Sequence, residues 1–174
     1  VKLLGESGGT VLVVHKPDAS SCLLRVQGFT ELVDAHNAKD GSAKIEVVAT
    51  LDGKGSREAG YAVTKDSIVS NPNLSAIFAI NDPSALGARS ALEEAGKQDQ
   101  VTIIGFDGEK AGKEAILKGT ILCDPIQFPD QMGKTTIEMI LKYFDGDDVP
   151  KEILIPSKLY YKADAEKDPA LQSG

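Results

Sequence analysis

Apolar runs alternate with helix-like segments along almost the whole chain. The apolar runs are short and mostly carry β-branched residues, which is typical of buried strands, whereas the segments between them place apolar residues at helical spacing. This pattern predicts strands at Val11–Val14, Lys44–Leu51, Ser75–Ile80, Val101–Gly105, Ile121–Ile126 and Glu152–Tyr161. Strands that alternate with helices through short loops favour a parallel sheet. We therefore expect an α/β fold in which a doubly wound parallel sheet has helices on both faces.

Capping residues predict where the helices begin. Ser20 or Ser21 suits the N-cap of the first helix, and Ser56 suits that of the second. Asp82, which a proline follows, is expected to cap the third helix, because proline is favoured in the first helical turn. A later helix, also opening with a proline, is expected over residues 129–144.

The C-terminal part of the chain is predicted to be less regular. Pro156 interrupts the strand expected at Glu152–Tyr161, which places this strand at an edge of the sheet or at a crossover. The tail Ala163–Gly174 carries several charges and is expected to fray.

The composition limits the classes to which the protein can belong. Its 174 residues suit one domain or slightly more. The net charge is -7, and Lys and Arg form no stripe, which argues against nucleic acid and anionic membrane surfaces as partners. No apolar run reaches the roughly 18–20 residues of a membrane span. The chain opens without an initiator Met or a signal peptide, which is typical of a processed, trimmed or truncated product.

The cysteines and histidines do not indicate a metal site. Cys22 and Cys123 are far apart in sequence, so we expect two buried thiols, with a disulfide as the less favoured alternative. His36 is expected on the surface, and His15 follows a strand and is a candidate to face a cleft. Neither has the Cys, Asp or Glu spacing of a metal ligand, so no metal or other cofactor is expected.

Polar clusters follow three of the predicted strands and supply the candidate binding residues. Asn81 ends the third strand, Phe106 and Asp107 follow the fourth, and Gln127 follows the fifth. Ligands of open α/β sheets bind outside the carboxyl ends of the strands. An amide offers a donor and an acceptor to hydroxyl groups, an ionised carboxylate accepts hydroxyl hydrogen bonds, and a phenyl ring provides an apolar wall.

Each candidate also has a purely structural interpretation. Asn81, taken alone, is better explained as a turn residue. Asp107 is equally well explained as a helix cap, Phe106 as a core residue and Gln127 as an exposed loop residue. Catalysis has no support, because the sequence contains no Gly-x-Ser-x-Gly turn, no phosphate-binding loop and no nucleophile–base pair.

Three segments resemble ribose-type periplasmic sugar-binding proteins: Asn73–Ala88, Ile104–Gly108 and Gln127–Gly133. They occur in the same order and at suitable spacing, and the resemblance extends from Val1 to about Lys162. Proteins of this family, which are related to the effector domains of sugar-responsive repressors, close two similar α/β lobes over a sugar like a clamshell. The resemblance implies that this chain holds the C-terminal lobe and lacks most of the N-terminal lobe.

The resemblance also implies a division of the chain. Residues 1–126 would form the C-terminal ligand-binding lobe. Residues 127–156 would form a helix and a strand that return to the mostly absent N-terminal lobe, and residues 157–174 the final strand and tail. Hinge crossings are implied near Ile126–Gln127 and Ile155–Ser157.

The sugar-contacting residues of the family fall on Asn81, Asp107 and Gln127, with Phe106 beside them. One position departs from the family, which usually places a ligand-binding Arg early in the first helix, where this chain has Leu23. Arg25 lies about 200° further around that helix and is expected to face away from the ligand. The loop at Gly53–Gly55 also lacks the aromatic residue that often packs on the sugar.

The function implied by the resemblance is that of a solute-binding component of an ABC-type importer. It would bind a monosaccharide or polyol in the periplasm, deliver it to a membrane permease and do no chemistry. The first alternative is the effector-binding domain of a sugar-responsive transcription regulator, which a helix-turn-helix upstream of Val1 would indicate. The second is an enzyme on the same fold. A lone lobe cannot enclose a sugar, so the helix over residues 129–144 is expected to pack on its own sheet or on another copy of the chain.

Overall fold

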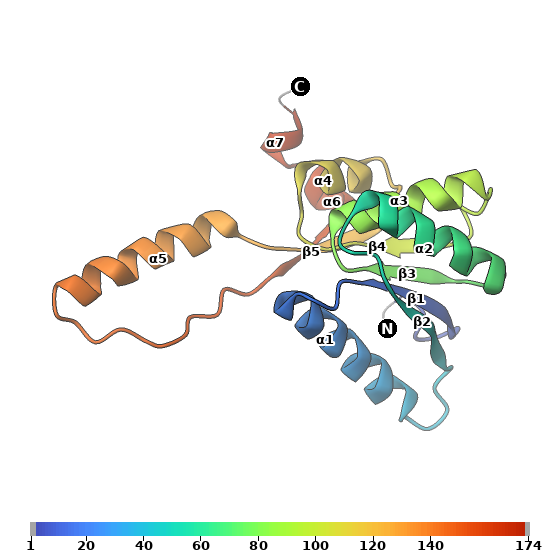
Figure 1. Ribbon diagram of the computed structural model, residues 1–174, viewed down its shortest axis with the longest axis horizontal. Helices are drawn as coiled ribbons and strands as arrows, with labels where there is room; N and C mark the ends of the chain where they lie inside the picture. The colour runs from blue at the N-terminus through green and yellow to red at the C-terminus, as the bar shows by residue number, and fades with distance from the viewer. Residues whose placement is uncertain (1–2, 173–174) are drawn as a thin grey trace.

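The computed structural model describes residues 3–172, in which one six-stranded sheet organises the chain (Figure 1). The strand order is β2-β1-β3-β4-β5-β6. The strands are β1 (Gly9–His15), β2 (Ile45–Asp52), β3 (Ala76–Ala79), β4 (Thr102–Ile104), β5 (Cys123–Ile126) and β6 (Lys158–Tyr161). The first five pair in parallel, and β6 pairs antiparallel with β5. The predicted α/β class is confirmed, and the antiparallel strand is an addition at one edge.

Helices cover both faces of this sheet, as predicted. In Figure 1, α1 lies on one face and α2, α3 and α4 lie on the other. The bounds are α1 (Ser20–Asn37), α2 (Arg57–Ser70), α3 (Asp82–Glu94), α4 (Lys110–Leu117), α5 (Pro129–Phe144), α6 (Lys162–Ala165) and α7 (Pro169–Gln172). No helix within residues 3–172 is both long enough and apolar enough to cross a membrane.

Two apolar cores lie against the two faces of the sheet. The larger core, on the side of α2 and α3, contains Leu12 and Leu92, whereas the smaller core, under α1, contains Val13 and Phe78. Phe78 stacks on Phe29 of α1 with the ring centroids 4.9 Å apart. Because β1 is buried on both faces, it is a continuous apolar run rather than an alternating one. This explains why short β-branched runs identified the strands.

The helix caps agree only partly with the predictions. Ser56 caps α2, as expected. The cap predicted at Asp82 is wrong, because Asn81 caps α3 and Asp82 takes the first helical position, where it is buried. The serine caps predicted for α1 are also wrong. Its N-cap is Ala19, which is extended and has no side-chain cap, so α1 begins at Ser20 without a capping side chain.

Both cysteines and His36 are buried. Cys22 and Cys123 are both free and buried, which confirms the thiol interpretation. Burial raises the pKa of Cys123 to about 11. The surface position expected for His36 is wrong, because the residue is buried and its Nε2 lies 2.9 Å from Ala43 O in the loop before β2.

The C-terminal tail is ordered rather than frayed. The strand predicted from Glu152 begins only at Lys158, since residues 151–157 have no strand to pair with, and β6 then takes the predicted edge position. The short helices that follow pack on α4, where Asp168 Oδ2 accepts from Lys113 Nζ (2.9 Å) and from Tyr160 Oη (2.8 Å). Residues 173–174 of the predicted frayed tail lie outside the described residues.

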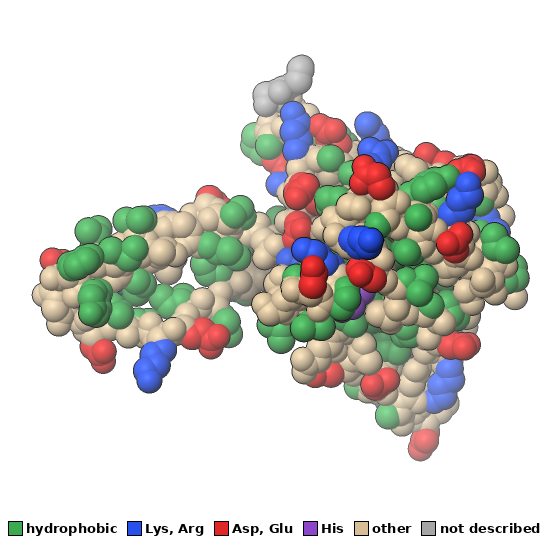
Figure 2. All heavy atoms as spheres, viewed as in Figure 1, with side chains coloured by type: hydrophobic (Ala, Val, Ile, Leu, Met, Phe, Trp, Pro, Cys, Tyr) green, Lys and Arg blue, Asp and Glu red, His purple; other side chains and the backbone are tan. Residues whose placement is uncertain are grey.

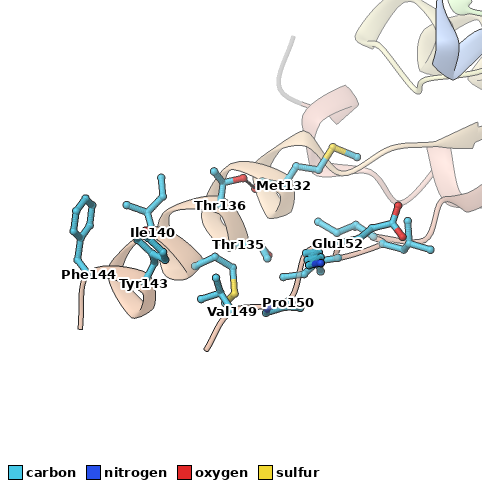
Figure 3. Close-up of a pocket in the computed structure, with 14 residues that line it drawn as sticks. Met132, Thr135, Thr136, Ile140, Tyr143, Phe144, Val149, Pro150 and Glu152 are labelled. Atoms are coloured by element: carbon cyan, nitrogen blue, oxygen red, sulfur yellow. Dashed lines mark hydrogen bonds between the residues drawn. The ribbon is translucent and has the colours of Figure 1, made fainter. Parts of the chain in front are cut away.

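The helix α5 projects away from the sheet, together with the segment that returns from it (Figure 1). None of its residues is buried, so the expectation that it packs on its own sheet is wrong. Apolar side chains gather on this arm in Figure 2, and the most exposed include Ile137, Leu141 and Phe144. Figure 3 shows side chains of α5 and of the returning segment that line a groove between them. The returning residues are 149–155, and the groove has a volume of about 890 Å³. The groove is open and apolar, which is typical of a surface that is buried against another part of a protein.

Candidate functional site

Four predicted residues lie at the carboxyl edge of the sheet. Asn81 follows β3, Phe106 and Asp107 follow β4, and Gln127 follows β5. All four are half-buried. The strands β3, β4 and β5 are adjacent, and β4 pairs in parallel with both of its neighbours. The loops that follow them therefore open at the same edge of the sheet. The structure brings Asp107 into contact with Gln127, and it brings both Asp107 and Phe106 into contact with Arg25.

The guanidinium of Arg25 joins α1 to the loop after β4. Its Nη2 lies 2.8 Å from Asp107 Oδ1, and its Nη1 donates to Ile80 O (2.8 Å). Its Cζ lies 3.9 Å from the centroid of the Phe106 ring, which is the geometry of a cation–π contact. The side chain is only 11% exposed, so these contacts are shielded from solvent. The prediction that Arg25 faces away is wrong.

A signal in the sequence could have placed Arg25 correctly. It lies three residues after Cys22 and four before Phe29, and both of these side chains pack against the sheet. Residues three and four apart share a helix face. Leu23, which occupies the position expected for an arginine, is 50% exposed instead. An arginine therefore does reach the site from this helix, but from Arg25 on the face toward the sheet and not from the exposed position of Leu23.

Asp107 is the centre of the polar network. Its Oδ1 accepts from Gln127 Nε2 (2.6 Å) as well as from Arg25. The backbone adds two further bonds, from Asp107 N to Pro125 O (3.2 Å) and from Gln127 N to Asp107 O (3.0 Å). Within the described part of the chain, Oδ2 has no hydrogen bond, and the side chain is 23% exposed. It therefore has acceptor capacity left for a ligand.

The backbone at Asp107 adopts an uncommon conformation, with φ at 100°. Side chains other than glycine seldom occupy this region, and such strain gathers at functional sites. The bonds to Pro125 and Gln127 hold the residue in place despite this conformation. The helix cap considered for Asp107 is not observed, because the N-cap of α4 is Glu109.

The side-chain amide of Asn81 uses both its oxygen and its nitrogen in hydrogen bonds that stabilise the fold. Its Oδ1 accepts from Ser84 N (3.1 Å) at the start of α3, and its Nδ2 donates to Gly55 O (3.0 Å). The bond to Gly55 fixes the loop after β2 beside the loop after β3. Among the residues that the structure describes, the Asn81 side chain bonds to neither Arg25 nor Asp107, so it lies at the same edge without joining their network.

Other charged residues border this edge. Lys16 follows β1 and is 37% exposed, with a weak ion pair to Asp18 at 3.7 Å. His15, the last residue of β1, is buried rather than open to a cleft. Among residues 3–172, no group of three or more His, Cys, Asp or Glu side chains has an arrangement that suits a metal ion. The site therefore offers hydrogen bonds and an aromatic surface.

The chain belongs to the family of periplasmic binding protein domains, whose model matches residues 1–148. It is 32% identical over 161 residues to the ribose import binding protein of Salmonella typhimurium, covering 92% of this chain and 52% of that protein. The chain thus spans about half the length of such relatives, which are import binding proteins.

Solved structures agree with this assignment. A solute-binding protein of an ABC transporter from Bacillus halodurans, with bound myo-inositol, is 27% identical at a TM-score of 0.80, covering 92% of this chain and 54% of that one. A periplasmic solute-binding protein from Actinobacillus succinogenes shares the fold at a TM-score of 0.87 and 24% identity, covering 96% of this chain and 56% of that one. The ribose import binding protein and the solute-binding protein with bound myo-inositol are transport components rather than transcription regulators, so the regulator alternative is not favoured.

Proposed function

We propose that this chain is one lobe of the solute-binding component of an ABC-type importer and that it binds a monosaccharide or polyol without chemistry. The observation that carries the proposal is the Arg25–Asp107–Gln127 network at the carboxyl edge of the sheet. In that network one carboxylate is held by two donors and keeps an unpaired oxygen. Vicinal hydroxyl groups suit such a site, because each can donate to the carboxylate and accept from a nearby N–H.

Phe106 would supply the apolar contact for the sugar. Arg25 covers its ring at 3.9 Å from the centroid, and the ring remains half-buried rather than enclosed. The C–H groups of a sugar ring form an apolar face that packs on aromatic rings. Gln127 and Asn81 would provide amides at the two sides of the carboxylate. Binding by pre-oriented polar groups and one aromatic ring is the usual composition of a small-molecule site.

The second half of the binding site would come from a partner lobe. We propose that residues 1–126 form one lobe, that residues 127–156 pack on the other, and that residues 157–174 complete the first. The pairing of β6 with β5 supports the last of these assignments. The exposed apolar groove of α5 and residues 149–155 supports the second, since a large exposed apolar surface marks a place where another part of a protein packs. Without that lobe, α5 would favour self-association.

In this proposal the bound sugar is held between lobes in the periplasm and released to a membrane permease. The relatives support this role, because they include a ribose import binding protein and a solute-binding protein with bound myo-inositol.

A thermal-shift screen tests the proposal. D-ribose, other aldoses and myo-inositol are added at increasing millimolar concentrations, with nucleotides as a comparison. A ligand that binds only the folded state stabilises it by RT ln(1 + [L]/Kd). The proposal predicts concentration-dependent stabilisation by at least one sugar or polyol, which Asp107→Ala removes. Stabilisation by nucleotides alone, or an unchanged shift in Asp107→Ala, would contradict it.

A further inference from the structure

Two carboxyl groups are buried together beneath the candidate site. Asp82 is the first residue of α3, and Asp124 is the second residue of β5. Both are 0% exposed. Neither residue takes part in an ion pair within residues 3–172, and neither contacts the surface where a sugar would bind. Their burial therefore needs an explanation that is independent of the proposed function.

Glycines provide the space in which the two carboxyls meet. A Cβ atom on Gly105 would lie 2.5 Å from Asp124 Oδ1 and 3.2 Å from Asp82 Oδ1. A Cβ atom on Gly112 would lie 2.2 Å from the carboxyl carbon of Asp82. Both carboxyls thus approach the same point beside Gly105. A side chain at position 105 would fill that space.

The hydrogen bonds of the pair are incomplete if both groups are ionised. Asp82 Oδ2 accepts from Glu109 N at 2.6 Å. The remaining oxygens, Asp82 Oδ1 and both oxygens of Asp124, have no partner in the described chain. Two carboxylates cannot bond to each other, because both only accept. A proton on one of them supplies the missing donor and removes the repulsion between two buried charges.

The surroundings allow one negative charge but not two. The N-terminus of α3 and the Glu109 N–H favour a single charge on Asp82. Asp107 repels both carboxyls, and the neighbouring thiol of Cys123 supplies no positive charge. No Lys, Arg or His of the described residues forms an ion pair with either group. Such a pair resembles two acids that share one proton at a buried site.

We propose that Asp82 and Asp124 share one proton and that this acid pair positions the loop that carries Phe106 and Asp107. The link to the loop is the bond from Glu109 N to Asp82 Oδ2, two residues after Asp107. A second link is the close packing of Gly105, where a Cβ atom would lie 2.5 Å from Asp124 Oδ1. The acid pair therefore bonds to the loop at Glu109 and packs against it at Gly105, while Arg25 and Gln127 hold Asp107 between them.

The sharing of one proton makes stability depend on pH. Burial, a hydrogen bond with Asp124 and repulsion from it raise the pKa of Asp82 to about 9, and burial raises the pKa of Asp124. Unfolded aspartates titrate near pH 4. Between about pH 5 and 8 the folded pair keeps a proton that the unfolded chain has lost. The unfolding equilibrium constant should therefore rise about tenfold per pH unit through this pair.

The test compares urea unfolding of the 174-residue chain with that of D124N between pH 5 and 8. The amide introduced by D124N donates to Asp82 without a titrating proton, so the tenfold slope should disappear relative to the unmodified chain. D66N, which changes an exposed aspartate of α2, should keep the slope. Equal slopes in the unmodified chain and D124N would overturn the shared proton.

Two NMR readouts separate proton sharing from general packing. In the ¹³C carboxyl spectrum at pH 7, one of the two buried groups should be protonated, and two ionised signals would overturn the proposal. Hydrogen exchange of the Glu109 amide should be at least tenfold faster in D82A, while D82N, which keeps an acceptor oxygen, should restore protection. Equal exchange in D82A and D82N would overturn the positioning role. None of these measurements needs a sugar, so they succeed or fail independently of the proposed function.

Discussion

Arg25 Nη2 lies 2.8 Å from Asp107 Oδ1, and this ion pair joins the first helix to the loop that follows the fourth strand. Both side chains are largely shielded from solvent, and the same guanidinium covers the Phe106 ring. The pair therefore stabilises the fold and orients the carboxylate at the same time. Each role leads to its own prediction.

Arg25→Ala should destabilise the folded chain by about 1–3 kcal/mol, because it leaves a shielded carboxylate with one donor fewer and removes the packing on Phe106. Urea unfolding monitored by circular dichroism measures the change. Lys134→Ala is the matched control, since Lys134 and Glu138 form an exposed ion pair on α5 worth less than about 0.5 kcal/mol. Equal losses in the two variants would show that the Arg25 pair has no special stabilising role.

Much of the candidate site was predictable from the sequence because its residues follow strands that are easy to recognise. Asn81, Asp107 and Gln127 each end an apolar run, and parallel strands bring such ends together. A family position counted along the chain does not predict the direction of Arg25, because its side chain follows the apolar face of α1. The acid pair is not predictable from the sequence, because Asp82 and Asp124 are 42 residues apart. They come together only because the sheet places the strand β5 near the start of α3.

The extent of the strands and of the tail was harder to predict, because it depends on contacts between distant segments. The strand expected from Glu152 has no neighbour until Lys158 reaches β5. The charges of the tail predict fraying, yet Asp168 is held by Lys113 and Tyr160. The charge of the tail alone predicts exposure. The tail is ordered by a partner that is far away in the sequence, since Lys113 lies more than fifty residues before Asp168.

Gly112→Ala should destabilise the chain by about 1–3 kcal/mol or more, although alanine is the better helix former. The new Cβ atom would lie 2.2 Å from the carboxyl carbon of Asp82, so the buried acid must move. Gly28→Ala is the control within α1, where a Cβ atom meets nothing within 4 Å. It should stabilise by roughly 0.5–1 kcal/mol. Stabilisation by Gly112→Ala would contradict the close packing around Asp82, and thermal unfolding of both variants decides.

Ile140→Asp combined with Phe144→Asp should weaken self-association of the chain and leave its unfolding free energy within about 0.5 kcal/mol. Both residues line the open groove of α5, and neither packs on the sheet. Sedimentation velocity at several concentrations measures the association. Val69→Asp on α2 is the control, since that valine is 82% exposed and lies outside the groove. A chain that is monomeric throughout, or association that is unaffected by the α5 changes, would count against this surface.

The most direct test of the sugar-binding site is an NMR titration of the ¹⁵N-labelled chain with D-ribose and myo-inositol. A lone lobe should bind weakly, so saturation is expected at millimolar concentrations. The side-chain signals of Arg25, Asn81 and Gln127 should shift together, Asp66→Asn should leave the shifts intact, and Asp107→Ala should abolish them. Shifts that map to other residues, or that persist in Asp107→Ala, would contradict the proposed site.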